Sequence, residues 1–241
     1  MRMSNIFMRP DQPNFIWRGA NAAVDYELTV EEEIQEISPN ERFNEIVVPG
    51  MNGSLTEWDG DYDSYPLTIK GCKIPYNRLA EVKRWLRGSG QLITHNDTDK
   101  YRQAVCNMNI PQTFTNEWGV FYTFDLNFKC QPFRKKVNDI PHDITSKPKV
   151  IFNPGDEECQ PDFEIHSNGG TLIIKINNTE ITLLDTPRGV IFIYSELGQV
   201  VSSQKYIRTI GEWPLLKMGK NLISITGNYS KAKMWKRSVW F

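Results

Sequence analysis

The sequence lacks several features that mark common protein classes. No apolar run approaches the roughly 18 residues that a membrane-spanning helix needs, so we expect no membrane span. Residues 1–14 contain no apolar segment before a small-residue cleavage site, so we expect no classical secretory signal. An excess of one charge is also missing: 28 Lys and Arg against 29 Asp and Glu give a net charge of −1. This balance argues against a protein that coats nucleic acid by bulk charge.

Metal-binding and redox motifs are absent too. The four cysteines are widely spaced, with no CxxC pair, and a cysteine in an alternating segment usually behaves as a small buried hydrophobe. None of the three histidines lies in an H-x-x-x-H arrangement. Asp59, Asp61 and Asp63 have the spacing of a calcium loop, but Ser64 and Lys70 occupy the positions that an EF-hand gives to Gly and Glu. We therefore expect no metal and no cofactor.

Signatures of catalysis are equally scarce. The sequence has no G-x-S-x-G, no P-loop and no G-x-G-x-x-G after a strand. Carboxylates are plentiful, so counting leaves a glycosidase pair open, but nothing distinguishes one pair from another. We expect a protein that is not an enzyme and keep a hydrolase as an alternative.

What the first half does contain is alternation of polar and apolar residues. Such alternation predicts strands with one buried face, and it occurs in four segments: 24–30, 65–69, 104–110 and 120–130. One helix interrupts them, from Arg78 to Leu86, with Asn77 as its cap and an apolar stripe along one side. A single helix among many strands predicts an α+β domain of curved antiparallel sheets with one packed helix.

The second half favours an all-β structure. The candidate strands are 161–167, 171–177, 189–194, 220–226 and 232–241. Asn168-Gly169-Gly170 is a plausible hairpin turn between the first two, and short strands with such turns predict a β-sandwich. We therefore divide this mostly β protein into a domain at 1–133 (net charge −5), a polar, proline-bearing linker at 134–146 and a domain at 147–241.

Acidic residues concentrate in one stretch of the first half. Between Asp25 and Asp63 there are twelve carboxylates and a single basic residue, Arg42. One interpretation is a solvated face that adds solubility. The other is a surface that must not bind a polyanion.

Several short motifs, taken in order, point to a known family. They are Val48–Ser54, similar to a P-G-x-(D/N)-G turn; Gly60–Tyr62 before the strand Leu67–Gly71; the helix Arg78–Leu86 followed by Gly88–Leu92; Asn96–Asp99 before Lys100–Ala104; and Gly211–Asn221, similar to a P-x-L-x-x-G-x-N turn. In this order and spacing, the chain resembles the distal tail proteins (Dit) of long-tailed phages with flexible tails, over nearly its whole length.

The resemblance implies a structural protein of the phage tail tip or baseplate, made in the host cytoplasm and carried in the virion. Members of the family form a ring, commonly a hexamer, at the tip of the tail tube. Their N-terminal domain builds this homo-oligomer and stacks on the tail tube protein. A galectin-like C-terminal domain points outward and docks tail-tip or receptor-binding proteins. DNA passes through the channel without specific nucleic-acid binding.

Two sets of residues are candidates for this role. A ring around DNA should expose like charge to the duplex, so Glu31, Glu32 and Glu33 are candidates for lining the channel.

The aromatic residues Trp58, Tyr62 and Tyr65 are candidates for the subunit interface, because Trp and Tyr are enriched at interface hot spots; alternatively, they pack on their own domain.

The competing function is a carbohydrate-binding β-sandwich module. Against it, His166-Ser167-Asn168 is followed by two glycines where a galectin sugar motif has Arg.

Overall fold

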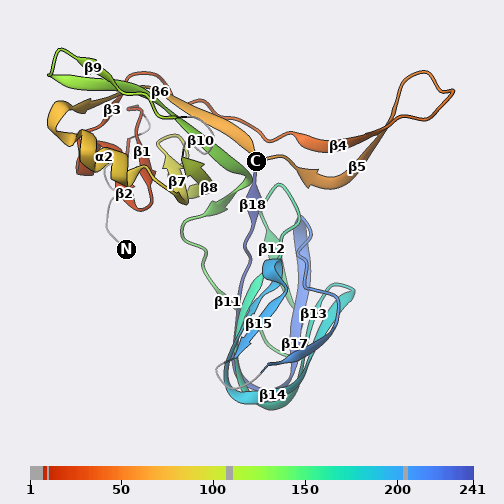
Figure 1. Ribbon diagram of the computed structural model, residues 1–241. Coiled ribbons are helices and arrows are strands. Elements are labelled where there is room, and N and C mark those ends of the chain that lie inside the picture. Colours follow the sequence, from red (N-terminus) through yellow and green to blue (C-terminus); the bar gives the residue numbers. More distant parts are fainter. Residues whose placement is uncertain (1–7, 10, 107–110, 203–205) are drawn as a thin grey trace. The chain divides into compact units, whose positions relative to one another are not determined.

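The computed structural model describes residues 8–9, 11–106, 111–202 and 206–241 (Figure 1). The predicted mostly β fold is confirmed: antiparallel strands dominate, and helices are few and short. The chain divides into two compact units, Met1–Arg134 together with Phe241, and Lys135–Trp240.

The first unit is built on one curled antiparallel sheet with the strand order β2-β1-β7-β8-β10-β6-β3 and with β9 paired to β10. Its strands are β1 (Phe15–Trp17), β2 (Ala20–Asn21), β3 (Thr29–Val30), β6 (Tyr65–Pro75), β7 (Ser89–Thr94), β8 (Lys100–Cys106), β9 (Thr115–Glu117) and β10 (Phe121–Lys136). The predicted strand at 104–110 is seen as far as Cys106, and residues 107–110 lie outside the described part of the chain.

The core of this unit follows from the alternation in β6 and β10. Leu67 pairs with Phe128, and Ile69 pairs with Leu126, and all four side chains are buried on the same face. Helix α2 (Leu79–Trp85) covers this face, since Val82 and Trp85 are buried and belong to the same core cluster.

The helix boundaries differ from the prediction. A 3-10 turn, η2 (Tyr76–Arg78), precedes α2, and Arg78 rather than Asn77 occupies the N-cap position, without a side-chain capping hydrogen bond. The predicted strand at 24–30 is wrong over its first half, where helix α1 (Ala22–Tyr26) forms instead. The Asn21 side chain accepts hydrogen bonds from the backbone N–H groups of Ala23 and Val24, and this local cap outweighs the alternating pattern.

Two further strands leave the main sheet. Among the described strands, β4 (Glu41–Ile46) and β5 (Leu55–Tyr62) pair only with each other, and they form a long antiparallel hairpin. We call residues 41–62 the arm. Within the first unit it extends away from the curled sheet (Figure 1), and every residue of β4 is exposed.

The second unit is one antiparallel sheet with the order β11-β17-β13-β14-β15, to which β12 and β16 add at β17 and β14. Its elements are β11 (His142–Asp143), β12 (Lys149–Asn153), β13 (Asp162–Ile176), β14 (Thr179–Tyr194), η3 (Ser195–Leu197), β15 (Gln199–Ser202), β16 (Arg208–Gly211), β17 (Gly219–Trp235) and β18 (Val239–Trp240). Buried residues alternate with outward ones along both halves of β13, as in the pairs Phe163 and Ile165, and Ile174 and Ile176.

The glycine pair at 169–170 lies inside a strand rather than in a turn, so the predicted hairpin there is wrong. Both glycines have positive φ, and the register of β13 against β14 shifts between Gly170 and Leu172, which is a β-bulge. The hairpin turn comes later, at Asn177-Asn178, where Ile176 pairs with Thr179 and Asn177 takes φ 52°. Positive φ suits a bulge as well as a turn, which is why the sequence signal misled.

The segment predicted as a linker carries structure of its own. Residues 135–146 fall in the second unit, β11 pairs with the end of β17, and Ile144 is buried. The division into two independently folding domains remains a prediction.

Candidate subunit interface

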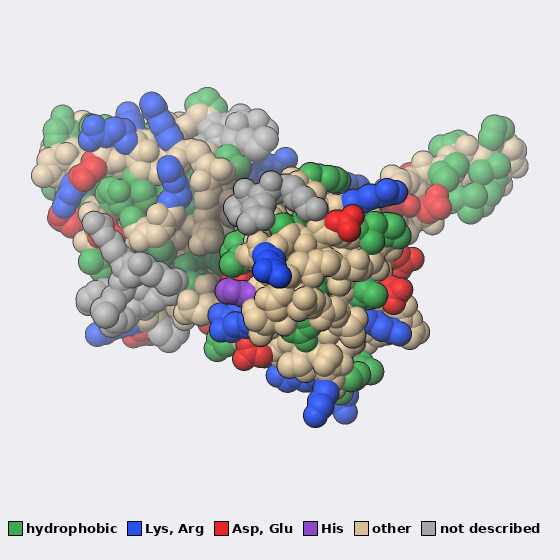
Figure 2. Space-filling view, turned by 90° about the horizontal axis from the view of Figure 1, so that it is seen from below, with side chains coloured by type: hydrophobic (Ala, Val, Ile, Leu, Met, Phe, Trp, Pro, Cys, Tyr) green, Lys and Arg blue, Asp and Glu red, His purple; other side chains and the backbone are tan. Residues whose placement is uncertain are grey.

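The arm carries an unusual number of exposed apolar side chains. Most lie in its turn and the adjoining strand ends, and they are Phe43, Ile46, Val47, Val48, Met51, Leu55 and Trp58. Val47 is the most open of them, with 78% of its surface exposed. Figure 2 shows hydrophobic side chains gathered at the far end of the projecting arm. A contiguous exposed apolar patch with polar surroundings marks an interaction surface.

The strands of the arm are acidic. The carboxylates are Glu41, Glu45, Glu57, Asp59, Asp61 and, one residue past the arm, Asp63. The single cation, Arg42, forms ion pairs with Asp61 (2.7 Å) and Asp63 (2.8 Å). The surface therefore combines an apolar turn with negative strands, a pattern that suits a partner with an apolar hollow and a positive rim.

Two of the three predicted interface aromatics lie on the arm. Trp58 is 44% exposed, donates from Nε1 to the Asp61 carbonyl (3.1 Å) and meets Tyr62 edge to face, with ring centroids 5.9 Å apart. Tyr62 also packs on Phe133 and Phe241 (5.3 and 5.1 Å between centroids). Tyr62 thus secures the base of the arm, whereas Trp58 leaves a large apolar surface open.

Tyr65, the third, is buried at the start of β6, so it is withdrawn from the candidate interface. Its hydroxyl accepts a hydrogen bond from Nε of the buried Arg102 (3.0 Å), and burial raises the pKa of Tyr65 above its ordinary value. Arg102 also donates to Thr94 Oγ1 (3.0 Å) and pairs with Glu36. Because Glu36 lies in the segment that leads into the arm, this network ties that segment to the core.

The three candidate channel residues are all exposed and follow β3 directly. Glu31 pairs with Lys73, and Glu33 Oε1 lies 2.8 Å from Nε2 of the buried His95. Within the described chain, Glu32 makes no hydrogen bond or ion pair. Glu32 is therefore the member of the set whose charge is most freely presented to solvent.

The sequence reasoning missed the apolar turn of the arm. The signal was present, because Ile46-Val47-Val48 is an apolar run beside a Pro-Gly turn between two acidic segments. An exposed aromatic side chain outside the arm was missed as well: Trp118, at the turn between β9 and β10, is 96% exposed.

The cysteines and the possible ligand groups give no sign of a reactive centre in the described part of the chain. All four cysteines are free and buried, and burial raises the pKa of Cys106, Cys130 and Cys159 to about 12. Among residues with described positions, no cluster of three or more His, Cys, Asp or Glu could hold a metal ion. No described helix is long and apolar enough to cross a membrane.

No protein-family model matches the chain, and no curated protein matches it. Among solved structures, the fold is similar to the crystal structure of the Dit protein (gp 19.1) of SPP1, a paradigm of the hub adsorption apparatus in phages infecting Gram-positive bacteria. The TM-score is 0.70 at 13% sequence identity, and the match covers 92% of this chain and 96% of that chain. The resemblance to distal tail proteins is thereby confirmed at the level of the fold.

Proposed function

We propose that this chain is a non-enzymatic structural protein of a phage tail tip or baseplate. Six copies form a ring that joins the tail tube protein to tail-tip and receptor-binding proteins, and DNA passes through its channel. The proposal is supported by the likeness to the SPP1 protein, which extends over nearly the full length of both chains. The observation that carries it is the arm, because an isolated hairpin with an exposed apolar turn requires a partner surface to cover it.

Self-association through the first unit accounts for the composition of the arm. A hairpin that pairs with no third strand gains little stability by itself in water. Burial of its apolar turn against a neighbouring copy supplies the missing hydrophobic contribution, at about 25 cal/mol per Å² of apolar surface. In a monomer the same side chains would only promote aggregation.

The acidic residues before the arm have a separate part in the proposal. Glu31, Glu32 and Glu33 are exposed, and we assign them to the wall of the channel. Negative side chains there repel the phosphates of passing DNA, so the duplex slides without binding. The second unit, to which we assign the role of the galectin-like domain, would remain outside the ring and dock the other tail proteins.

The deciding experiment is light scattering coupled to size-exclusion chromatography over a range of protein concentrations, followed by negative-stain imaging. A closed ring of six copies is expected, formed by the protein alone or with the tail tube protein. A strict monomer at every concentration, in the presence of the tube protein as well, would refute the proposal.

A specific observation favours carbohydrate binding as the second candidate function. On the outward side of β14, the Phe192 and Tyr194 rings are stacked (6.4 Å between centroids, 13° between planes) and each is 37% exposed. Glu164 pairs with Phe192 across the strands, and its Oε1 lies 2.9 Å from His166 Nε2. Aromatic faces beside polar groups suit sugar rings. Glycan binding that is lost in Phe192→Ala would support this function, and no binding to any glycan of an array would exclude it.

A further inference from the structure

A ring built from identical copies by head-to-tail contacts needs two different surfaces on each copy. In the proposed ring the arm is one of these surfaces, and the surface that receives it must lie elsewhere on the same chain. The composition of the arm defines what that surface should offer: a hollow for apolar side chains and cations for the acidic strands.

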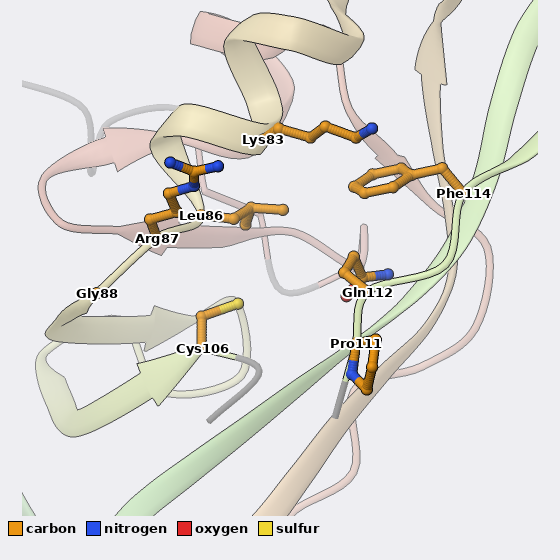
Figure 3. Close-up of a pocket in the computed structure, with 8 residues that line it drawn as sticks. All are labelled: Lys83, Leu86, Arg87, Gly88, Cys106, Pro111, Gln112 and Phe114. Carbon is orange, nitrogen blue, oxygen red and sulfur yellow. The ribbon is translucent and has the colours of Figure 1, made fainter. Parts of the chain in front are cut away.

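In the described part of the first unit, a hollow of this kind lies beside the end of helix α2. Its lining residues are Lys83, Leu86, Arg87, Gly88, Cys106, Pro111, Gln112 and Phe114, and its volume is about 380 Å³. We call it the α2 pocket. Leu86 and Phe114 approach it from opposite sides (Figure 3), which gives it an apolar interior. The volume is sufficient for one or two aliphatic side chains.

The rim of the α2 pocket is positively charged. Two of its lining residues, Lys83 and Arg87, are exposed cations, and Arg84 is a further exposed cation of helix α2. The Lys83 ammonium lies 5.1 Å from the centroid of the Phe114 ring. Among the described residues, none of these three cations has a carboxylate within ion-pair distance. Cations near the end of a helix stabilise its dipole without any partner. The helix dipole can therefore explain the cations, but it does not explain why an apolar hollow lies beside them.

The location of the two surfaces fits a head-to-tail contact. Within the first unit, α2 and the arm lie at opposite ends of the curled sheet (Figure 1). A contact between the arm of one copy and the α2 pocket of the next is therefore heterologous, and it closes into a ring when the rotation between copies permits.

We propose that the arm of each copy docks on the α2 pocket of its neighbour. Apolar side chains of the arm turn, such as Val47 and Met51, enter the hollow. The carboxylates of the arm strands lie against Lys83, Arg84 and Arg87. This inference rests on the proposed ring and adds the identity of the receiving surface.

Charge reversal on each side tests the docking. Lys83→Glu with Arg87→Glu gives an acidic rim, and Glu57→Lys with Asp59→Lys gives a basic arm. Each double variant should lose the ring, with association weakened by at least about tenfold, because like charges then face each other. The fourfold variant, which carries both reversals, should form the ring again.

Mixing gives a second, independent readout. In an equimolar mixture of the two double variants, each acidic arm meets a basic rim and each basic arm meets an acidic rim. Alternating rings with an even number of copies should therefore form from two proteins that do not assemble separately. Lys217→Glu with Lys220→Glu, two exposed cations of the second unit, is the matched control and should leave the ring intact.

The outcomes separate the two proposals. If the unmodified protein forms no ring, the proposed function fails. If it forms rings and the rim reversal leaves them unchanged, the ring stands and the docking on the α2 pocket is refuted.

Should a reversed variant fail to fold, intermolecular cross-linking decides between the same outcomes. The Met51→Cys and Lys83→Cys proteins, each also carrying Cys106→Ser because Cys106 lines the α2 pocket, are mixed under oxidising conditions. The other three native cysteines are buried and give little background. A disulfide between the two proteins supports the docking, and rings without it overturn the inference.

Discussion

Replacement of Trp58 by alanine separates assembly from folding. Trp58 lies on β5, is 44% exposed, and contacts mainly Tyr62 and its own strand in the isolated chain. If the arm is the subunit interface, the exposed part of the indole becomes buried only in the ring. Trp58→Ala should therefore weaken the ring far more than it lowers the stability of the monomer.

The magnitude follows from the exposed fraction. An aromatic side chain buries at most about 250 Å², so the open 44% of Trp58 corresponds to roughly 110 Å². At about 25 cal/mol per Å², its burial contributes about 2.7 kcal/mol to each interface, or roughly a hundredfold in the association constant. The hydrogen bond from Nε1 to the Asp61 carbonyl is exposed, and water replaces it at little cost.

The assay is analytical ultracentrifugation of the variant across a concentration series, with thermal melting measured in parallel. Trp118→Ala is the matched control, because Trp118 is even more exposed but lies on the β9–β10 turn rather than on the arm. The control should assemble normally. Equal losses of assembly and melting temperature in Trp58→Ala, or normal assembly with intact folding, would refute the assignment of Trp58 to the interface.

Three other predictions follow from the described contacts. Glu32→Lys should leave stability within about 0.5 kcal/mol, because the side chain is solvated, yet slow DNA ejection from virions by giving phosphates a cation to bind; normal ejection would reject the channel assignment. A 135–240 fragment should fold as a monomer by hydrogen exchange and sizing, whereas 147–241 should be less stable because it lacks β11 and the buried Ile144. An unfolded or oligomeric 135–240 fragment would contradict the two-domain division. The thiols of Cys106, Cys130 and Cys159 have folded pKa values of about 12, raised by burial above the ordinary value of about 8.5. Their contribution to the free energy of unfolding is therefore complete below about pH 8.5 and is lost as pH rises toward 12. The denaturant concentration at the unfolding midpoint should accordingly fall between pH 8 and pH 10.5. A constant midpoint over this range would contradict the prediction.

The mostly β fold and much of the core of the first unit follow from local side-chain patterns in the sequence. The alternation from 120 to 130 predicted the strand β10 and its buried residues Leu126 and Phe128, because covalent geometry alone places successive side chains of a strand on opposite faces. The apolar stripe at 79–86 likewise predicted helix α2, since residues three and four apart share one face of a helix.

Other features depend on how distant segments of the chain pair and pack. Tyr65 and Trp58 have similar sequence surroundings but differ in burial. Tyr65 lies on β6, which pairs with β10 and packs in the core, so it is buried. Trp58 lies on β5, which among the described strands pairs only with β4, so it is exposed. The glycines at 169–170 suit a turn or a bulge equally well, and the long pairing of β13 with β14 and β17 selected the bulge. The cations beside the α2 pocket gained meaning only once the fold placed an acidic arm at the other end of the same unit. Each of these outcomes depends on contacts between residues distant in the chain, which local side-chain patterns do not encode.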